Sequence, residues 1–224
     1  HLLTGAVEAG EGDLSMRVLI GVMNDSAETK NAWAGFLIGA GSTDDDYRSR
    51  ALIHQAYGKN GGLIAAINGE GEILFLDNEN GRKSIPPNRN KPYPRRGFSR
   101  RGVELILNAE VKNDHCEVIL RAIDQATGVM IDSAGINHIT TERLSGNVAL
   151  AAHMSYRKKR GSFWFGNWEI KGSKLEVNKS NRLGPVVGVQ YTVSDGVLNL
   201  TAQMAPVSLK DQQPVKLEVA PKGT

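Results

Sequence analysis

The chain has 224 residues, of which 40% are hydrophobic, and carries a formal net charge of +3. This length and apolar content are enough for one large β domain, or for one domain and part of another, around a hydrophobic core. No apolar run approaches the roughly 20 residues that span a bilayer, and the single cysteine, Cys116, excludes an internal disulfide. We therefore expect a soluble globular protein with no membrane partner. The chain begins with His1 rather than Met, which indicates a processed or trimmed product.

Alternation of apolar and polar residues with a period of two is the dominant pattern, and it predicts an all-β fold. In chain order, the expected strands are residues 15–22, 33–40, 47–56, 62–68, 72–77, 102–111, 116–122, 146–155 and 162–172. The connections are rich in Asn, Asp and Gly, which tolerate the positive φ of hairpin turns. Because no amphipathic helix interrupts these runs, we expect a jelly-roll sandwich of two antiparallel sheets. Cys116 lies on the apolar face of its strand, so we expect its thiol to be buried.

The segment "RGSFWFGNWEIKG", residues 160–172, contains four aromatic residues in six positions. In a regular strand, Trp164 and Trp168 lie on one face, and Phe163 and Phe165 lie on the other. Apolar residues on both faces are typical of a strand that is covered on both sides, so we expect this cluster in the core. The alternative is that one tryptophan, Trp168, stacks on a ligand.

The positive charge of the chain is local. Eight of the 27 basic residues lie between Arg82 and Arg101, which contains no acidic residue, so the rest of the chain has a net charge of −5. This segment also holds four of the eight prolines, which predict a long exposed loop between strands. Tyr93 and Phe98 within it are compatible with binding to a nucleic acid or another anionic polymer. Because no other nucleic-acid signature occurs, we expect a solvated loop and no nucleic-acid partner.

The strand pattern restarts near residue 183, after the segment "SNRLGP". The remaining strands resemble the first part of an immunoglobulin-like or fibronectin-like module in length and turn spacing, but the segment is too short to complete one. We therefore expect a sandwich domain over residues 1–182, followed by a linker and the first strands of an immunoglobulin-like module over 183–224. The alternative is that these last strands pack on the sandwich domain.

The expected strand at 47–56 is the main candidate for a binding face. Arg48, Arg50 and His54 share one face of it, with Tyr47 beside them. Two guanidinium groups about 7 Å apart suit a carboxylate, sulfate or phosphate. The alternative is an outward face on which the arginines are simply solvated.

An acidic run immediately precedes this strand. Asp44 and Asp45, with the aspartate that follows them, offer carboxylate oxygens of the kind that bind calcium. The spacing is not that of an EF-hand, and three consecutive aspartates cannot all point inward. We therefore expect calcium at Asp44 and Asp45 or, alternatively, a solvated acidic loop without a cofactor.

The usual signatures of several enzyme classes are absent from the sequence. No strand carries the alternating acids of a sandwich glycosidase. The histidines are scattered singly, without zinc-ligand spacing, and no nucleophile elbow, P-loop or dinucleotide-binding motif occurs. No catalytic residue is therefore assigned from motifs.

Two stretches carry a family resemblance. Residues 31–55 and 162–177 resemble the concanavalin A-like, laminin G-like sandwich, and residues 183–207 are similar to a segment of secreted bacterial alkaline phosphatase D-type (PhoD-like) metallophosphoesterases. In those proteins the segment links an amino-terminal sandwich to an immunoglobulin-like module and a catalytic domain. The resemblance implies an extracytoplasmic, periplasmic or secreted, bacterial location and an attached catalytic domain. It assigns no phosphatase metal ligand to any residue of this chain.

Three functions are compatible with these observations. The first is a non-catalytic accessory module that binds a polysaccharide or another anionic ligand beside the catalytic domain of a larger secreted hydrolase. The second is a glycoside hydrolase or lyase that uses His54 as base and Tyr47 or Tyr156 as acid. The third is a structural spacer that only packs on its neighbour.

Overall fold

The computed structural model describes residues 4–23, 31–41, 57–89, 93, 102–113, 115–154, 162–181, 186–204 and 216–219. Within these ranges every strand pairing is antiparallel, and the helical structure consists of one short 3₁₀ turn, η1 (Thr141–Leu144). No helix in the described part of the chain is long and apolar enough to span a membrane. The chain divides into two compact units, His1–Asn181 and Arg182–Thr224.

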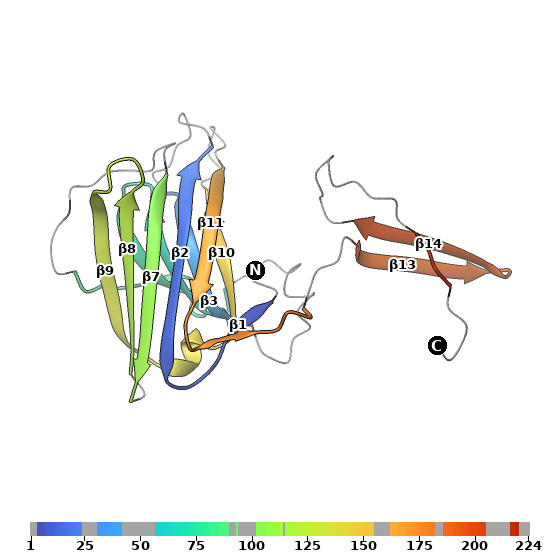
Figure 1. Ribbon diagram of the computed structural model, residues 1–224, viewed down its shortest axis with the longest axis horizontal. Coiled ribbons are helices and arrows are strands. Elements are labelled where there is room, and N and C mark those ends of the chain that lie inside the picture. The colour runs from blue at the N-terminus through green and yellow to red at the C-terminus, as the bar shows by residue number, and fades with distance from the viewer. Residues whose placement is uncertain are drawn as a thin grey trace. The chain divides into compact units, whose positions relative to one another are not determined.

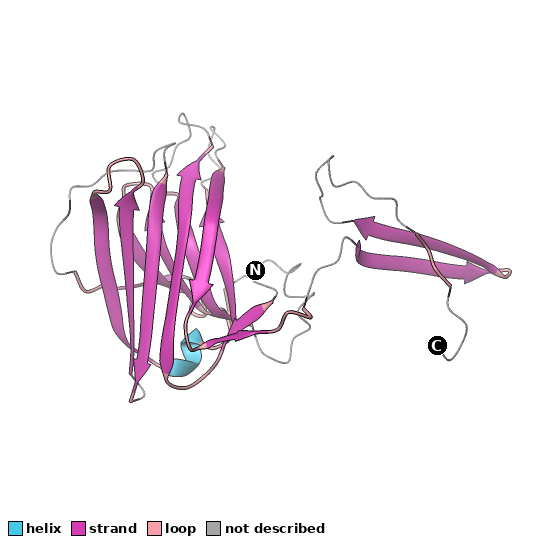
Figure 2. Cartoon of the chain, in the orientation of Figure 1, coloured by secondary structure: helices cyan, strands magenta, loops and turns pink. Residues whose placement is uncertain are grey.

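The first unit is a sandwich of two five-stranded sheets (Figures 1 and 2). The first sheet has the order β11-β2-β7-β8-β9. Its strands are β2 (Gly12–Val22), β7 (Val103–Lys112), β8 (His115–Asp124), β9 (Met130–Ile139) and β11 (Phe163–Lys171). The prediction of an all-β sandwich of two antiparallel sheets is therefore confirmed.

The second sheet has the order β10-β3-β4-β5-β6 and lies behind the first in Figure 1. Its strands are β3 (Trp33–Ala40), β4 (Leu63–Asn68), β5 (Ile73–Asp77), β6 (Lys83–Ile85) and β10 (Asn147–His153). A small additional pair, β1 (Gly5–Val7) with β12 (Leu175–Val177), belongs to the same unit. β6 falls within the segment that was predicted to be a loop, so the beginning of the basic segment is the edge strand of this sheet.

The core between the two sheets forms because the strands alternate between inward apolar and outward polar residues. Along β8, Cys116, Val118 and Leu120 are buried, whereas Glu117 is exposed. The second sheet contributes large buried side chains, including Phe36 and Phe75. Burial of the Cys116 thiol, predicted from its position in the strand, is confirmed, and this burial raises its pKa to about 11. A thiol with such a pKa is a core residue and not a nucleophile.

The aromatic strand β11 contains a β-bulge between Gly166 and Glu169, where Asn167 has a positive φ of 50°. A bulge adds one residue to one strand and therefore reverses the facing of every side chain beyond it. As a result Phe163, Phe165 and Trp168 all pack, partly buried, against the core. The prediction that Trp164 and Trp168 share a face is wrong, because it assumed an unbroken strand.

Trp164 instead lies over the glycines of neighbouring strands. A Cβ added at Gly21 would lie 2.4 Å from the Trp164 ring. We expect Gly21→Val to lower the free energy of unfolding by about 1 kcal/mol, because the ring must move off the sheet. Urea denaturation followed by tryptophan fluorescence measures this. Gly166→Ala is the matched control, since its Cβ would make only an ordinary 3.8 Å contact with Trp164, and an equal loss in both variants would contradict the expectation.

An ion pair anchors the connection that passes from the first sheet to the second. Arg143 lies in η1, between β9 and β10, and its two terminal nitrogens donate to the carboxylate of Asp77 at 3.1 and 2.5 Å. Asp77 ends β5 and also accepts the backbone N–H groups of Glu79 and Asn80. The side chains of Asp77 and Arg143 are 14% and 24% exposed. This carboxylate therefore fixes both the β5–β6 turn and the crossing connection.

The second unit contains a hairpin of β13 (Val186–Ser194) and β14 (Val197–Met204). Its register places Val189, Tyr191 and Val193 opposite Ala202, Leu200 and Leu198, so one face of the hairpin is apolar. These strands agree in position with the predicted restart of the pattern. Their assignment to an immunoglobulin-like module stays a prediction.

Candidate functional site

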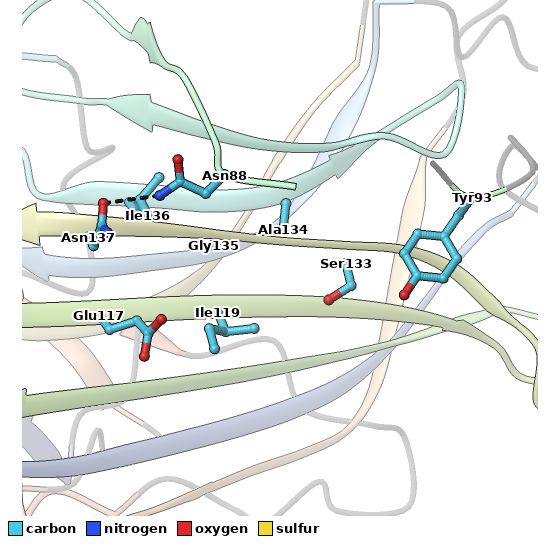
Figure 3. Close-up of a pocket in the computed structure, with 9 residues that line it drawn as sticks. All are labelled: Asn88, Tyr93, Glu117, Ile119, Ser133, Ala134, Gly135, Ile136 and Asn137. Carbon is cyan, nitrogen blue, oxygen red and sulfur yellow. Dashed lines mark hydrogen bonds between the residues drawn. The ribbon is translucent and has the colours of Figure 1, made fainter. Parts of the chain in front are cut away.

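A shallow pocket of about 150 Å³ lies on the first sheet, at its β8–β9 edge (Figure 3). Most of its lining is polar. The lining residues are Asn88, Tyr93, Glu117, Ile119, Ser133, Ala134, Gly135, Ile136 and Asn137. Tyr93 lies at the Ser133 end of the pocket, and the two asparagines lie at the other end (Figure 3).

Strands β8 and β9 hold the floor of this pocket. The outward positions of β8 are Glu117 and Ile119, because the residues between them are buried in the core. Ile119 is the register partner of Gly135, whose lack of a side chain leaves the pocket open. The register of β8 with β9 shifts between Cys116 and Val118. Such a bulge re-aims side chains, and it lies where Asn137 reaches the pocket.

The segment after β6 forms the wall of the pocket. Pro86 and Pro87 have no N–H groups, which favours an extended backbone. Asn88 then pairs with the edge strand: its N–H donates to the Gly135 carbonyl at 2.7 Å and its carbonyl accepts the Gly135 N–H at 3.0 Å. The Asn88 Nδ2 also donates to Asn137 Oδ1 at 3.0 Å (Figure 3). This wall is therefore fixed to β9 by both backbone and side chain.

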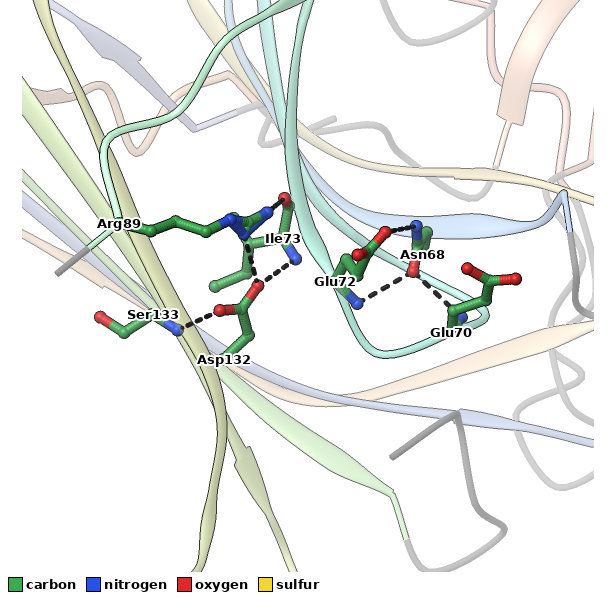
Figure 4. Close-up of polar contacts among 7 residues, drawn as sticks. All are labelled: Asn68, Glu70, Glu72, Ile73, Arg89, Asp132 and Ser133. Carbon is green, nitrogen blue, oxygen red and sulfur yellow. Dashed lines mark hydrogen bonds and ion pairs between the residues drawn. The ribbon is translucent and has the colours of Figure 1, made fainter. Parts of the chain in front are cut away.

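A network centred on the buried side chain of Asp132 holds this wall to both sheets (Figure 4). Asp132 on β9 accepts the Ile73 N–H of β5 at 2.8 Å and an Arg89 Nη1–H at 3.1 Å through the same oxygen. The other Arg89 terminal nitrogen donates to the Ile73 carbonyl at 2.6 Å. The remaining Asp132 oxygen accepts the Ser133 N–H at 2.9 Å. Asp132 therefore accepts the N–H of Ile73, and Arg89 donates to the carbonyl of Ile73. These contacts of Arg89 fix the backbone next to Asn88.

A second, wider pocket of about 290 Å³ adjoins the first and shares Glu117 and Asn137 with it. It is also lined by Glu110, Lys112, His115 and Cys116. Lys112 pairs with Glu110 at 2.6 Å, and this hydrogen bond raises the pKa of the lysine. We call the two pockets together the β8–β9 groove.

The groups in the groove suit the hydroxyl groups of a ligand. An amide such as that of Asn88 or Asn137 both donates and accepts, and a carboxylate such as Glu117 accepts from two hydroxyls. Tyr93 offers an aromatic ring and a hydroxyl, and Ile119 offers a small apolar surface. Among the described residues, no group of three or more His, Cys, Asp or Glu side chains is arranged to hold a metal ion.

Most of the predicted site residues lie outside the described ranges. These are Tyr47, Arg48, Arg50 and His54 of the predicted binding face, and Asp44 and Asp45 of the predicted calcium site. Their assignments stay predictions. Trp168 is described: its ring packs against the core, and its Nε1 is buried without a hydrogen-bond partner among the described residues. The structure does not bring Trp168 into the β8–β9 groove, whose lining residues do not include it.

Few features of the sequence identify the groove residues. β9, "MIDSAGINHI", was not among the expected strands, because Asp132, Ser133 and Asn137 interrupt its apolar alternation. Tyr93 is recognisable in the sequence only as an aromatic residue within a basic segment. One feature of the sequence does point to a binding strand. It is the occurrence of polar residues among apolar ones directly after the hairpin turn at 124–129.

No family model matches the chain, and no curated protein matches it. Among solved structures, it is similar to arcelin-5, a lectin-like defense protein from Phaseolus vulgaris, with 8% sequence identity and a TM-score of 0.36. The similarity covers 75% of this chain and 76% of arcelin-5. At this level of similarity, a functional assignment depends on the groove residues themselves.

Proposed function

We propose that the chain is a carbohydrate-binding module whose ligand occupies the β8–β9 groove. The observation that carries this proposal is the convergence of Asn88, Asn137, Ser133 and Glu117 with one tyrosine ring on a single shallow pocket. Ligand sites typically combine a few placed polar groups with an apolar or aromatic surface. A sugar ring matches both, because its hydroxyls lie around the edge and its C–H groups lie on the faces.

The rigidity of the groove supports binding. Its floor is two paired strands, and its wall is fixed by the Asn88–Gly135 and Arg89–Asp132 contacts. A site that is ordered before the ligand arrives loses little conformational entropy on binding. Shallow, pre-formed polar sites of this kind suit recognition of a polymer surface.

We expect Asn137→Ala and Tyr93→Ala each to weaken glycan binding by about 10-fold, because each removes a polar partner or a stacking surface from the ligand. Isothermal titration calorimetry with neutral, uronic and sulfated oligosaccharides, selected on a glycan array, measures this.

Trp33→Ala is the control for these variants. Trp33 belongs to β3 of the second sheet, where it stacks on His153 with ring centroids 6.0 Å apart, so we expect unchanged affinity. Absence of binding to every glycan would refute the proposal and favour a structural spacer. Loss of binding only in Trp33→Ala would place the site on the second sheet.

A second function, glycoside hydrolysis, is favoured by one observation. Glu110 and Glu117 are direct register partners on β7 and β8, so their Cβ atoms lie about 5 Å apart. Two neighbouring carboxylates are the catalytic groups of most retaining glycosidases. In this chain, however, Glu110 is engaged by Lys112. New reducing ends released by the wild type, and not by Glu117→Gln, would establish hydrolysis.

We further propose that this module accompanies the catalytic domain of a larger secreted hydrolase, as the similarity of residues 183–207 to PhoD-like proteins suggests. Under this proposal the module raises the local concentration of substrate near that domain. The complete reading frame of the gene tests this directly. A frame without a hydrolase domain would refute this part of the proposal and leave the binding function unaffected.

A further inference from the structure

Arg121, on the outer face of the first sheet, has no acidic partner among the residues that the structure describes. Arg121 lies on β8, two residues beyond Ile119, and its side chain faces outward and is half-buried. Within the described part of the chain, no ion pair or hydrogen bond involves its guanidinium. A partly desolvated charge without a counter-ion is unfavourable, so it indicates a site that an external anion completes.

The surroundings of Arg121 strengthen its attraction for an anion. Its register partner on β7 is Ile106, and Ile119 and Ile123 precede and follow it on the same face of β8. All three isoleucines are half-buried. Apolar side chains around a charged group lower the local dielectric constant. A hydrogen bond to that group is then stronger than it would be in open water.

Arg121 is also adjacent to the groove. Its register partner on β9 is Ser133, which lines the pocket next to Tyr93. Opposite residues on paired strands have Cβ atoms about 5 Å apart, which is close enough for one ligand group to contact both the guanidinium and the serine hydroxyl. Glu117 lies four residues away on the same strand, about 13 Å along β8. The face therefore has a hydroxyl-binding end at Glu117 and Asn137 and a cationic end at Arg121.

The other described arginine of this row, Arg17, is already neutralised by Glu104 at 3.3 Å and Glu169 at 3.6 Å. Arg121 is thus the arginine of this row that is available to a ligand.

We propose that the ligand of the β8–β9 groove is an acidic glycan, and that Arg121 binds its carboxylate or sulfate group. This inference rests on the proposed carbohydrate-binding function and specifies the substrate class. Arg121 and Ser133 bind the anionic substituent, while Asn88, Asn137 and Glu117 bind hydroxyls of the same or the neighbouring sugar. A guanidinium matches the planar geometry of a carboxylate and also pairs with sulfate oxygens.

Matched pairs of oligosaccharides test the proposal. Oligogalacturonate is compared with its fully methyl-esterified form, and sulfated galactan oligomers are compared with their desulfated form, by isothermal titration calorimetry. We expect the wild type to bind the charged member of at least one pair about 10-fold more tightly. Arg121→Gln should abolish this preference and leave the affinity for the neutral member unchanged. High salt should weaken binding of the charged member alone.

Two further variants control for indirect effects. Arg17→Gln removes the ion-paired arginine that flanks Ile106 on the other side, and we expect it to keep the preference. Arg121→Lys retains the charge and should keep a reduced preference. If Arg121→Gln is poorly folded, Arg121→Lys still tests the role of Arg121, because it keeps the charge and changes only the shape of the side chain.

The outcomes separate this inference from the proposed function. A wild type that binds both members of each pair equally, in a manner that depends on Asn137, would overturn the anion subsite and preserve the carbohydrate-binding function. Retention of the preference in Arg121→Gln would likewise overturn the role of Arg121. Binding to no oligosaccharide would overturn both.

Discussion

Asp77→Asn is expected to lower the free energy of unfolding by about 2 kcal/mol at pH 7. The carboxylate of Asp77 accepts two hydrogen bonds from Arg143 and two from the backbone of the β5–β6 turn. Asparagine keeps one oxygen acceptor and places an NH₂ group against a guanidinium. Arg143 is then left partly buried without a counter-charge, and the connection from β9 to β10 is less firmly held.

The same pair predicts how stability depends on pH. The hydrogen bonds from Arg143 hold the pKa of the Asp77 carboxyl well below its usual value of 3.8. A depressed pKa in the folded state means that the pair contributes its full stability above pH 3.8 and loses it as the pH falls further. The difference in unfolding free energy between the wild type and Asp77→Asn should therefore be constant from pH 7 to about pH 5 and shrink below pH 4.

Urea denaturation at several pH values measures this difference. Glu110→Gln is the matched control, because Glu110 also pairs with a cation, Lys112, but both side chains are more than half exposed. Exposed pairs of this kind contribute little, so we expect stability to be unchanged. A pH-independent difference between the wild type and Asp77→Asn would show that the ionised pair is not the source of the stability.

Alternation alone predicted most of the sandwich, because one buried face imposes a period of two on each strand. β7 follows this period throughout, and β2 and β8 follow it over most of their length, so the inward position of Cys116 was predicted correctly. The Asn- and Gly-rich turns then determined which strands are hairpin partners. These properties are local, so a sequence contains them directly.

The parts that escaped prediction depend on residues far apart in the chain. The bulge in β11 reverses the facing of Trp168, and the Gly-Asn pair at 166–167, although it tolerates a positive φ, does not by itself distinguish a bulge from a turn. Arg143 and Asp77 are 66 residues apart, and nothing in either segment identifies the other as its partner. Ion pairs of this kind become visible only when the two sheets are in place.

The candidate site was missed for a related reason. A binding strand needs polar outward residues, and in β9 these residues and the buried Asp132 obscure the apolar period that reveals a strand. The wall residue Asn88 lies in a proline-rich segment whose composition indicates a loop, although its backbone pairs with Gly135. In β9, the polar residues that a binding site requires therefore weaken the apolar alternation by which a strand is recognised in the sequence.

Asp132 provides the strongest test that the groove is pre-formed. Its side chain is only 9% exposed and serves Arg89, Ile73 and Ser133 at once. We expect Asp132→Ala to lower the free energy of unfolding by about 3 kcal/mol, because it leaves the buried Ile73 N–H and the Arg89 charge without their acceptor. Urea denaturation at pH 7 measures the loss.

Asp132→Ala should also weaken glycan binding about 10-fold at temperatures where the variant is fully folded, although Asp132 does not line the pocket. The reason is that Arg89 holds the wall that carries Asn88, and a released wall must be ordered again when the ligand binds. Asp77→Asn is the control, because it breaks a comparable carboxylate–arginine pair that does not hold this wall. It should lose stability and keep its affinity. Equal affinity in both variants would show that the groove does not need the Arg89–Asp132 pair. The wall would then be held by the hydrogen bonds of Asn88 to the backbone of Gly135 and to the side chain of Asn137, since these contacts between Asn88 and the edge of the sheet remain.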